Sequence, residues 1–218
     1  ISLPLAKLSA ADQQYVKARL TPPISPEQAI AALEKLDVLK IFTFKKDDNG
    51  KLVFVYIVRS PKVTDAALVN VAAFTDLPNL VIELCDITGA GLEHLKGLVK
   101  LERLTLTGIS RITDADLVHL RGLANLNYLN LYADPKRSNN KITGAGLIHL
   151  KGLTKLEKLN LSANGITDAE LVHLKTFTNL RELYLFETEV TDAGVAELQK
   201  ALPNCKISWG LVSSLDAS

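Results

Sequence analysis

The sequence contains no methionine, only two cysteines and few aromatic residues, and its charges almost cancel. A net charge of +1 argues against a globally basic protein that binds nucleic acid and against a protein with an acidic tail. No apolar run approaches the ~18 residues that span a bilayer, and Ile1 does not open a signal sequence. Because methionine is absent, we expect the sequence to be part of a longer protein whose natural start has been removed.

What the sequence does contain is a repeated segment. Residues 153–174 align position by position with residues 177–198, without gaps. Each copy has two halves that differ in period. The first half alternates apolar and polar residues, which predicts a short strand, and the second half has the leucine spacing of a helix. Further copies begin at Leu98 and Leu123, and an incomplete copy begins at Leu202. A copy at Leu77 has a strand segment about three residues short. A degenerate copy has its strand near 52–58 and its helix after Thr64.

Polar residues mark the turns of each copy. A threonine precedes the helical half and is expected to be its N-cap, and an acidic residue three positions later completes a capping box at Asp116 and Glu170. Asparagine occurs at the turn into the next strand, where its tolerance of left-handed backbone is useful. The threonines are Thr113, Thr143, Thr167 and Thr191, and the asparagines are Asn125, Asn179 and Asn204.

This pattern, L-x-x-L-x-L-x-x-N/C/T-x-I/V-T-D-A-G-L-x-x-L, resembles the leucine-rich repeat over residues 52–209. It is most similar to the bacterial ribonuclease-inhibitor-like class, and the phrases Ile-Thr-Asp-Ala and Leu-Pro-Asn-Cys-Lys-Ile resemble planctomycete repeats. The resemblance implies an α/β fold, a curved right-handed solenoid of strand-helix units with a parallel β-sheet on the concave face and one true helix per unit. One unit cannot bury its own apolar face, whereas stacked units can.

Four segments are expected along the chain. Residues 21–76 form an N-terminal cap and the degenerate first repeat: a helix begins near Ser25, and a hairpin joins apolar runs 41–44 and 52–58 across a turn. The repeats occupy 77–201, and 202–218 supplies a C-terminal cap strand and tail. Residues 1–20 resemble the closing segment of an SLA1 homology domain 1, although a capping strand with a short helix explains them equally well.

Residues able to carry chemistry are scarce. All four histidines share one phase of the repeat, where they could form a metal ladder, but no acidic residue or cysteine completes a ligand set, and we interpret them as repeat filler. They are His94, His119, His149 and His173. The Gly-Ala-Gly triplets at 89–91 and 144–146 complete no phosphate-binding pattern. Cys85 and Cys205 occupy structural positions and are expected to be buried free thiols. We expect no enzymatic activity, no cofactor and no metal.

The candidate site is the strand face. In each unit the leucines point inward, so their neighbours project from the concave sheet. Aromatic residues and arginine are enriched at the energetic centres of protein interfaces, although tyrosine and threonine also suit a half-exposed sheet for structural reasons alone. The candidate partner-binding residues are Arg103, Thr105, Tyr128, Asn130, Tyr132, Lys158, Asn160, Glu182, Tyr184 and Phe186.

The sequence therefore predicts a non-enzymatic module that binds a protein or peptide through its concave face and is monomeric by itself. An insertion at 134–141, with Lys136, Arg137 and Lys141, would lie on the rim beside that face. The alternative is a structural spacer, or an assembly or targeting module, within a larger bacterial protein. The sequence identifies neither the ligand nor whether the protein is cytoplasmic or exported.

Overall fold

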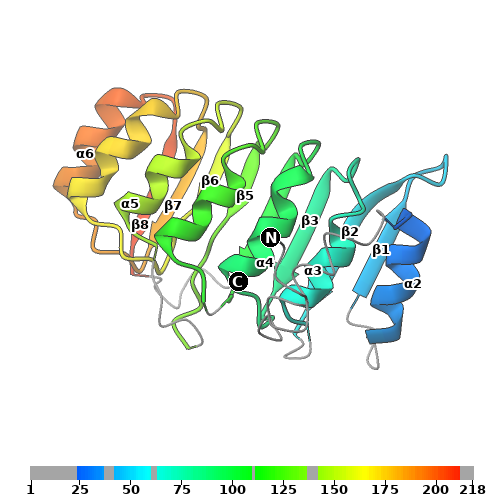
Figure 1. Ribbon diagram of the computed structural model, residues 1–218. Helices are drawn as coiled ribbons and strands as arrows, with labels where there is room; N and C mark the ends of the chain where they lie inside the picture. Colours follow the sequence, from blue (N-terminus) through cyan, green and yellow to red (C-terminus); the bar gives the residue numbers. More distant parts are fainter. Residues whose placement is uncertain (1–23, 37–41, 60–62, 110, 137–141, 212–218) are drawn as a thin grey trace, which may run out of the picture.

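The computed structural model describes residues 24–36, 42–59, 63–109, 111–136 and 142–211. These residues form one eight-stranded sheet in which the strands follow each other in chain order (Figure 1). β1 and β2 are antiparallel, and every later neighbour is parallel. The strands are β1 (Phe42–Lys46), β2 (Leu52–Val58), β3 (Asn79–Glu83), β4 (Arg103–Thr107), β5 (Tyr128–Asn130), β6 (Lys158–Asn160), β7 (Glu182–Phe186) and β8 (Lys206–Gly210).

The described helices all lie on one side of the sheet (Figure 1). Between the strands they bury leucines against the inward side chains of the sheet, so that one continuous apolar core runs through all units. The helical segments are α2 (Pro26–Leu36), α3 (Asp65–Val71), α4 (Gly89–Leu92), η2 (Glu93–Gly97), η3 (Asp114–Leu120), α5 (Gly144–Leu147), η4 (Ile148–Leu150), η5 (Asp168–Thr176) and α6 (Asp192–Ala201).

The helix and the hairpin expected near the start of the chain are present. Ser25 closes a reciprocal pair of hydrogen bonds with Gln28 at the start of α2, and Leu33 of this helix is fully buried. In the hairpin turn, Asp47 Oδ1 accepts from the backbone N–H groups of Asn49 and Lys51, at 3.0 and 2.9 Å. The predicted segment 1–20 lies outside the described residues.

The copy predicted to start at Leu77 is not shortened, which corrects the sequence alignment. Leu80 pairs with Leu104, so Leu77 occupies the position that Leu101 has in the next unit, and the unit begins at Phe74. Phe74 is buried and takes the place of the usual first leucine, as Phe177 does later in the chain. β3 therefore keeps full register with both of its neighbours.

The resemblance to the ribonuclease-inhibitor-like class implied a true helix in every unit, but the structure does not have one in each. The four units between α3 and α6 use 3-10 segments or single α turns. Longer α-helices occur at the ends of the repeat region, in α3 and α6.

The N-cap threonines are held in two alternating ways, by an aspartate of the preceding unit or by an acidic residue of their own helix. At three boundaries the first acidic residue of one helix accepts from both the backbone N–H and the hydroxyl of the next N-cap threonine, at 2.6–2.8 Å. These pairs are Asp65 with Thr88, Asp114 with Thr143, and Asp168 with Thr191. At the other two boundaries glycine replaces that aspartate, and the threonine forms the predicted capping box within its own helix, Thr113 with Asp116 and Thr167 with Glu170.

The glycines of the Gly-Ala-Gly triplets are explained by this alternation. A Cβ atom on Gly89 would lie 1.8 Å from Asp116 Oδ1, and one on Gly91 would lie 2.3 Å from Asp65 Oδ1. Each glycine thus leaves room for the carboxylate that binds a neighbouring threonine. In the last unit Asp192 has no following threonine, and the indole N–H of Trp209 donates to it at 2.9 Å instead.

The turn asparagines do not use left-handed backbone, contrary to the expectation from sequence. Asn125 and Asn179 instead donate their side-chain amides to carbonyls of the preceding unit, Val99 and Thr154, at 2.8 and 2.7 Å. Positive φ occurs elsewhere, directly after β2, β3 and β7 and three residues after the end of β6. Among the described non-glycine residues these are Arg59, Leu84, Ala163 and Glu187.

Both cysteines are buried thiols outside any disulfide, as predicted. Burial raises the pKa of Cys205 to about 11. In the native protein we therefore expect no alkylation of Cys205 at pH 8, measured by mass spectrometry after iodoacetamide treatment, whereas protein unfolded in urea reacts. Because the unfolded thiol loses its proton first as the pH rises past ~8.5, the contribution of Cys205 to stability should fall between there and pH 11. Complete labelling of native protein at pH 8 would contradict this burial.

Candidate interaction surface

The face of the sheet opposite the helices is not covered by any described helix (Figure 1), and the outward residues of the strands line it. We call it the open sheet face. Strand pairing aligns these residues in rows that cross the strands. The charged row is Arg103, Tyr128, Lys158, Glu182 and Lys206, and the neutral row is Thr105, Asn130, Asn160, Tyr184 and Ser208.

The predicted site residues lie together on this face, across β4 to β7. Their inward neighbours are buried and they themselves are mostly half-buried or exposed, as the alternation predicts. Thr105 is the exception: it is on this face but only 8 % exposed, so it offers little surface to a partner. The aromatic members Tyr128, Tyr132, Tyr184 and Phe186 are all half-buried.

The charged row is held by interactions between neighbouring strands. The Arg103 guanidinium lies over the Tyr128 ring, 4.1 Å from its centroid, and Lys158 Nζ is 2.6 Å from Glu182 Oε1. The Tyr184 hydroxyl donates to Glu182 Oε2 at 2.6 Å. The hydrogen bonds from Lys158 and Tyr184 lower the pKa of Glu182, and the nearby Glu182 carboxylate raises the pKa of Tyr184. Glu182 is therefore charged and Tyr184 neutral near pH 7.

Two asparagines of the neutral row form side-chain hydrogen bonds at the ends of the short strands β5 and β6. Asn130 Oδ1 accepts from the backbone N–H of Tyr132 at 3.0 Å, and Asn160 Oδ1 accepts from that of Ser162 at 2.9 Å. These bonds use the oxygen of each amide. Within the described part of the chain, the two Nδ2 groups have no hydrogen-bond acceptor, and the two residues pair on adjacent strands.

Sequence reasoning missed a second aromatic group on the same face, at β1 and β2. The Phe54 and Tyr56 rings are 6.3 Å apart, and Lys45 Nζ lies 5.2 Å from the centroid of Phe54. Tyr56 also donates to Glu83 Oε2 at 2.9 Å. The alternation within 52–58 could have placed both rings outward, but this strand was assigned to the cap and its outward residues were not considered.

The insertion after β5 is described in part. Lys136 is exposed, whereas Arg137 and Lys141 lie outside the described residues. At the base of the insertion, Tyr132, Ile142 and Asn164 line an apolar pit of about 20 Å³, which is too small for more than one water molecule. Desolvation, with Glu187 and Asp134 nearby, raises the pKa of Tyr132, so this hydroxyl also stays neutral near pH 7.

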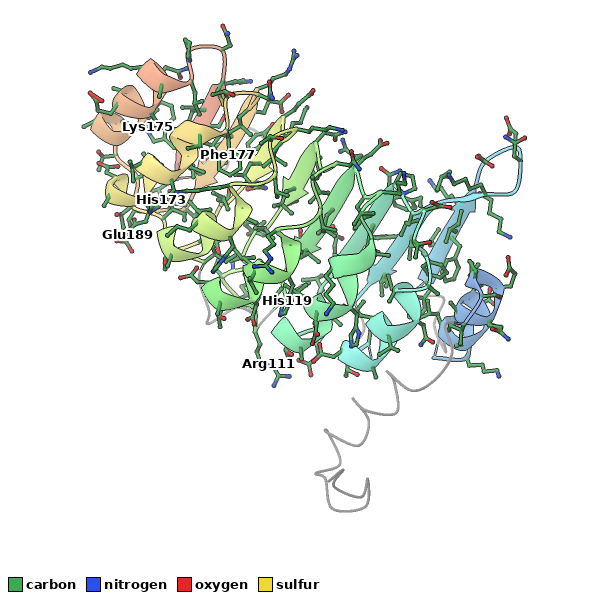
Figure 2. The ribbon with its side chains drawn as sticks, turned by 45° about the horizontal axis from the view of Figure 1, so that its top comes forward. Arg111, His119, His173, Lys175, Phe177 and Glu189 are labelled. Carbon is green, nitrogen blue, oxygen red and sulfur yellow. The ribbon has the colours of Figure 1, made fainter. Side chains whose placement is uncertain are left out.

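The histidines do not form a metal site. Figure 2 shows His119 and His173 on the helical side, on separate segments. Throughout the described ranges no cluster of three histidine, cysteine or acidic residues could hold an ion. We keep the interpretation that these histidines fill the surface of the repeat.

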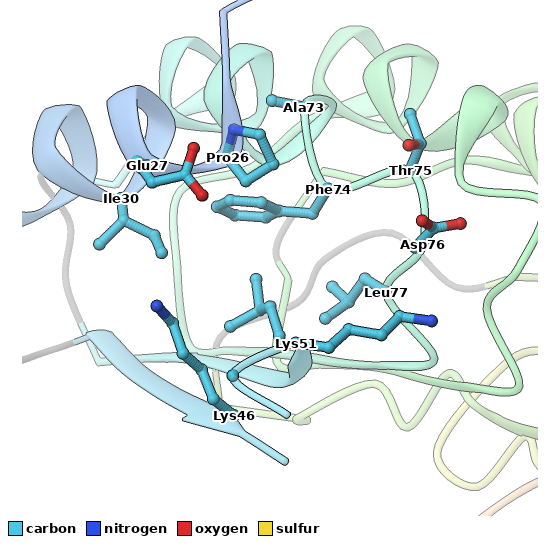
Figure 3. Close-up of a pocket in the computed structure, with 12 residues that line it drawn as sticks. Pro26, Glu27, Ile30, Lys46, Lys51, Ala73, Phe74, Thr75, Asp76 and Leu77 are labelled. Carbon is cyan, nitrogen blue, oxygen red and sulfur yellow. The ribbon is translucent and has the colours of Figure 1, made fainter. Parts of the chain in front are cut away.

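A larger cavity of about 200 Å³ lies between α2 and the hairpin (Figure 3). Phe74, Ile30 and Leu77 supply apolar walls, and Glu27 and Lys46 supply opposite charges. This mixed lining selects no ligand class. The cavity also adjoins Pro26, close to where the described chain begins.

Comparisons with known proteins agree with the repeat pattern. The family model described as a leucine-rich repeat matches residues 152–169. A leucine-rich repeat protein of Leptospira interrogans superimposes with a TM-score of 0.52 at 21 % identity, over 72 % of this chain and 37 % of that one. Internalin C2 of Listeria monocytogenes gives a TM-score of 0.49 at 21 % identity, over 76 % of each chain. No curated protein matches the sequence.

A plant peptide hormone receptor, RGFR1, in complex with RGF2, gives a TM-score of 0.47 at 15 % identity, over 76 % of this chain and 28 % of that one. The eight-stranded, mostly parallel sheet alternating with helices is an α/β leucine-rich repeat fold, which confirms the fold class predicted from the sequence. The comparisons select no subclass of the repeat. Among the described residues, no helix combines the length and the apolar character that crossing a bilayer requires.

Proposed function

We propose that this chain is a non-enzymatic module that binds a protein or peptide through the open sheet face, centred on β5 to β7. The observation that supports it most is the set of four half-buried aromatic side chains there, Tyr128, Tyr132, Tyr184 and Phe186, on a face that no described helix covers. Rigid aromatic rings beside polar groups supply large contact area at low entropic cost. Leucine-rich repeats generally bind proteins, which favours this role over a spacer.

The rings are already arranged for contact. Tyr184 and Phe186 lie 6.4 Å apart on one strand, and the Glu182 carboxylate fixes the Tyr184 hydroxyl. Between these rings and Tyr132 lies β6, whose outward residue Asn160 is smaller. A partner can therefore meet aromatic rings and amide donors together, and little rearrangement would precede binding.

Changing both Tyr184 and Phe186 to serine is expected to abolish binding of peptides selected on the wild-type protein from a random phage-displayed library. Each ring should contribute about 2 kcal/mol, so the pair should weaken binding by several hundredfold or more. Fluorescence anisotropy of the selected peptides measures the change, and circular dichroism checks that the variant is folded.

Phe54 and Tyr56 provide a matched control, since this pair lies on the same face at nearly the same ring separation. Their replacement by serine should leave binding within about twofold, because they lie on β2, outside the proposed centre. Equal losses in both double variants would move the centre of binding away from β5–β7. A library that yields no peptide sensitive to Tyr184 and Phe186 would favour the spacer or assembly role.

A further inference from the structure

We propose that the charged row binds an acidic peptide in the polyproline II conformation that crosses β4 to β8, with carboxylate side chains at every third residue. This inference rests on the proposed function and specifies its partner. The charged row places cationic side chains on alternate strands: Arg103 on β4, Lys158 on β6 and Lys206 on β8. Tyr128 and Glu182 lie on the strands between them.

The spacing of these cations selects the conformation of the peptide. Adjacent strands lie ~4.8 Å apart, so alternate strands present their side chains about 9.6 Å apart. A polyproline II helix has three residues per turn and a rise of 3.1 Å, so side chains at i and i+3 point the same way about 9.3 Å apart. An extended strand instead repeats its side chains every ~6.6 Å and would lose the match after one cation.

The charge balance of the row selects acidic side chains. Three cations stand against one anion, Glu182, and that carboxylate is compensated by Lys158 at 2.6 Å. Arg103 and Lys206 are exposed, and Arg103 is oriented by its stacking on Tyr128. An incoming carboxylate can therefore pair with Arg103 or Lys206 without breaking an ion pair, whereas a basic peptide would meet both as like charges.

The neutral row supplies hydrogen-bond donors for the backbone carbonyl groups of such a peptide. A polyproline II segment makes no internal hydrogen bonds, so its carbonyl groups remain free to accept. Asn130 and Asn160 present their Nδ2 donors on adjacent strands, next to the charged row, and their Oδ1 atoms are already held by backbone N–H groups. The Tyr128 and Tyr184 rings flank these donors, and aromatic side chains are what polyproline II ligands pack against.

The test compares three synthetic, fluorescein-labelled peptides by anisotropy at about 50 mM salt, where exposed charges are weakly screened. The first repeats Asp-Pro-Pro three times. The second has the same composition with the aspartates at alternate positions, and the third repeats Lys-Pro-Pro. We expect the first peptide to bind at least about fivefold more tightly than the second, and the third not to bind. Equal binding of the first and third peptides, or no binding of the first up to about 1 mM, would overturn the proposal.

Two single variants test the row itself. Lys206→Glu should weaken binding of the Asp-Pro-Pro peptide by about tenfold, because it reverses an exposed charge at one end of the row. Glu182→Gln should strengthen binding of this peptide by about threefold, because it removes the only anion of the row and leaves Lys158 available. Lys136→Glu is the matched control on the rim and should change binding less than twofold. Unchanged affinity in both row variants would contradict the assignment.

The random library separates this inference from the proposed function. If selected peptides depend on Tyr184 and Phe186 but carry no excess of acidic residues, the open sheet face binds a partner and the charged row does not choose it. If no selected peptide depends on those rings, the proposed function itself fails. Enrichment of acidic residues at a spacing of three would support both.

Discussion

Replacing Asn164 with alanine is expected to lower the free energy of unfolding by about 3 to 4 kcal/mol, one of the two largest effects that the structure predicts. Asn164 is 1 % exposed. Its Nδ2 donates to the carbonyls of Leu131 and Leu161, at 2.8 and 3.1 Å, and its Oδ1 accepts from the backbone N–H of Ile142 at 2.9 Å. Alanine would remove the partners of the buried Leu131 carbonyl and Ile142 N–H, whereas the Leu161 carbonyl would keep its bond from the backbone N–H of residue 164.

The same side chain fastens the insertion. Leu131 precedes the segment 134–141 and Ile142 follows it, so Asn164 joins both ends of the inserted segment to the turn after β6 in the next unit. Urea denaturation followed by circular dichroism measures the stability, and hydrogen exchange at the Ile142 amide reports the local bond. We expect faster exchange at Ile142 in the variant, beyond the loss in global stability.

Asn179 is the matched control for this measurement. It is an exposed asparagine whose Nδ2 donates to a single carbonyl, that of Thr154, at 2.7 Å. Its replacement by alanine should cost about 1 kcal/mol or less, because water can take over the bond. Equal losses at Asn164 and Asn179 would show that burial of the Asn164 amide does not matter to the fold.

The second large effect concerns Gly194, where any side chain meets the preceding unit. A Cβ atom there would lie 2.0 Å from Asp168 Oδ1 and 2.3 Å from Asp168 Cγ. Gly194→Glu should therefore cost about 3 kcal/mol in unfolding free energy, by displacing the carboxylate that binds Thr191. Gly122 offers a control, since a Cβ there would meet nothing within 4 Å, and Gly122→Glu should be nearly neutral.

A compensating change makes this prediction specific. At the boundary between Gly144 and Glu170, the chain itself uses the opposite arrangement, with glycine in the first helix and an acidic residue in the second. The double variant Asp168→Gly with Gly194→Glu reproduces that arrangement around Thr191 and should recover most of the stability lost by Gly194→Glu alone. Purely additive losses, measured by urea denaturation, would contradict the coupling between units.

The periodic features of the fold could be predicted from sequence because they recur with local spacing. The inward leucines, the N-cap threonines and the capping boxes at Asp116 and Glu170 are all defined within one unit, and the structure confirms them. The outward position of the candidate residues followed from the same alternation. The hairpin could be predicted because its turn residues are adjacent in the chain.

The features that escaped prediction are those that join different units. Asp65 and Thr88 are 23 residues apart, and only the glycine at 91, which leaves room for the carboxylate, signals that Asp65 reaches Thr88. The start of a unit at Phe74 was missed because phenylalanine replaces the leucine used to align copies. The contact of Asn125 with Val99 likewise depends on how two units stack.

Hydroxyl-radical footprinting, with and without a peptide selected from the library, tests the central claim most directly. It measures the solvent exposure of individual aromatic side chains on the open sheet face. Binding is predicted to protect Tyr128, Tyr184 and Phe186 while leaving Phe54 unprotected. Protection confined to the helical side of the molecule, or no change at these rings in a saturated complex, would contradict the account.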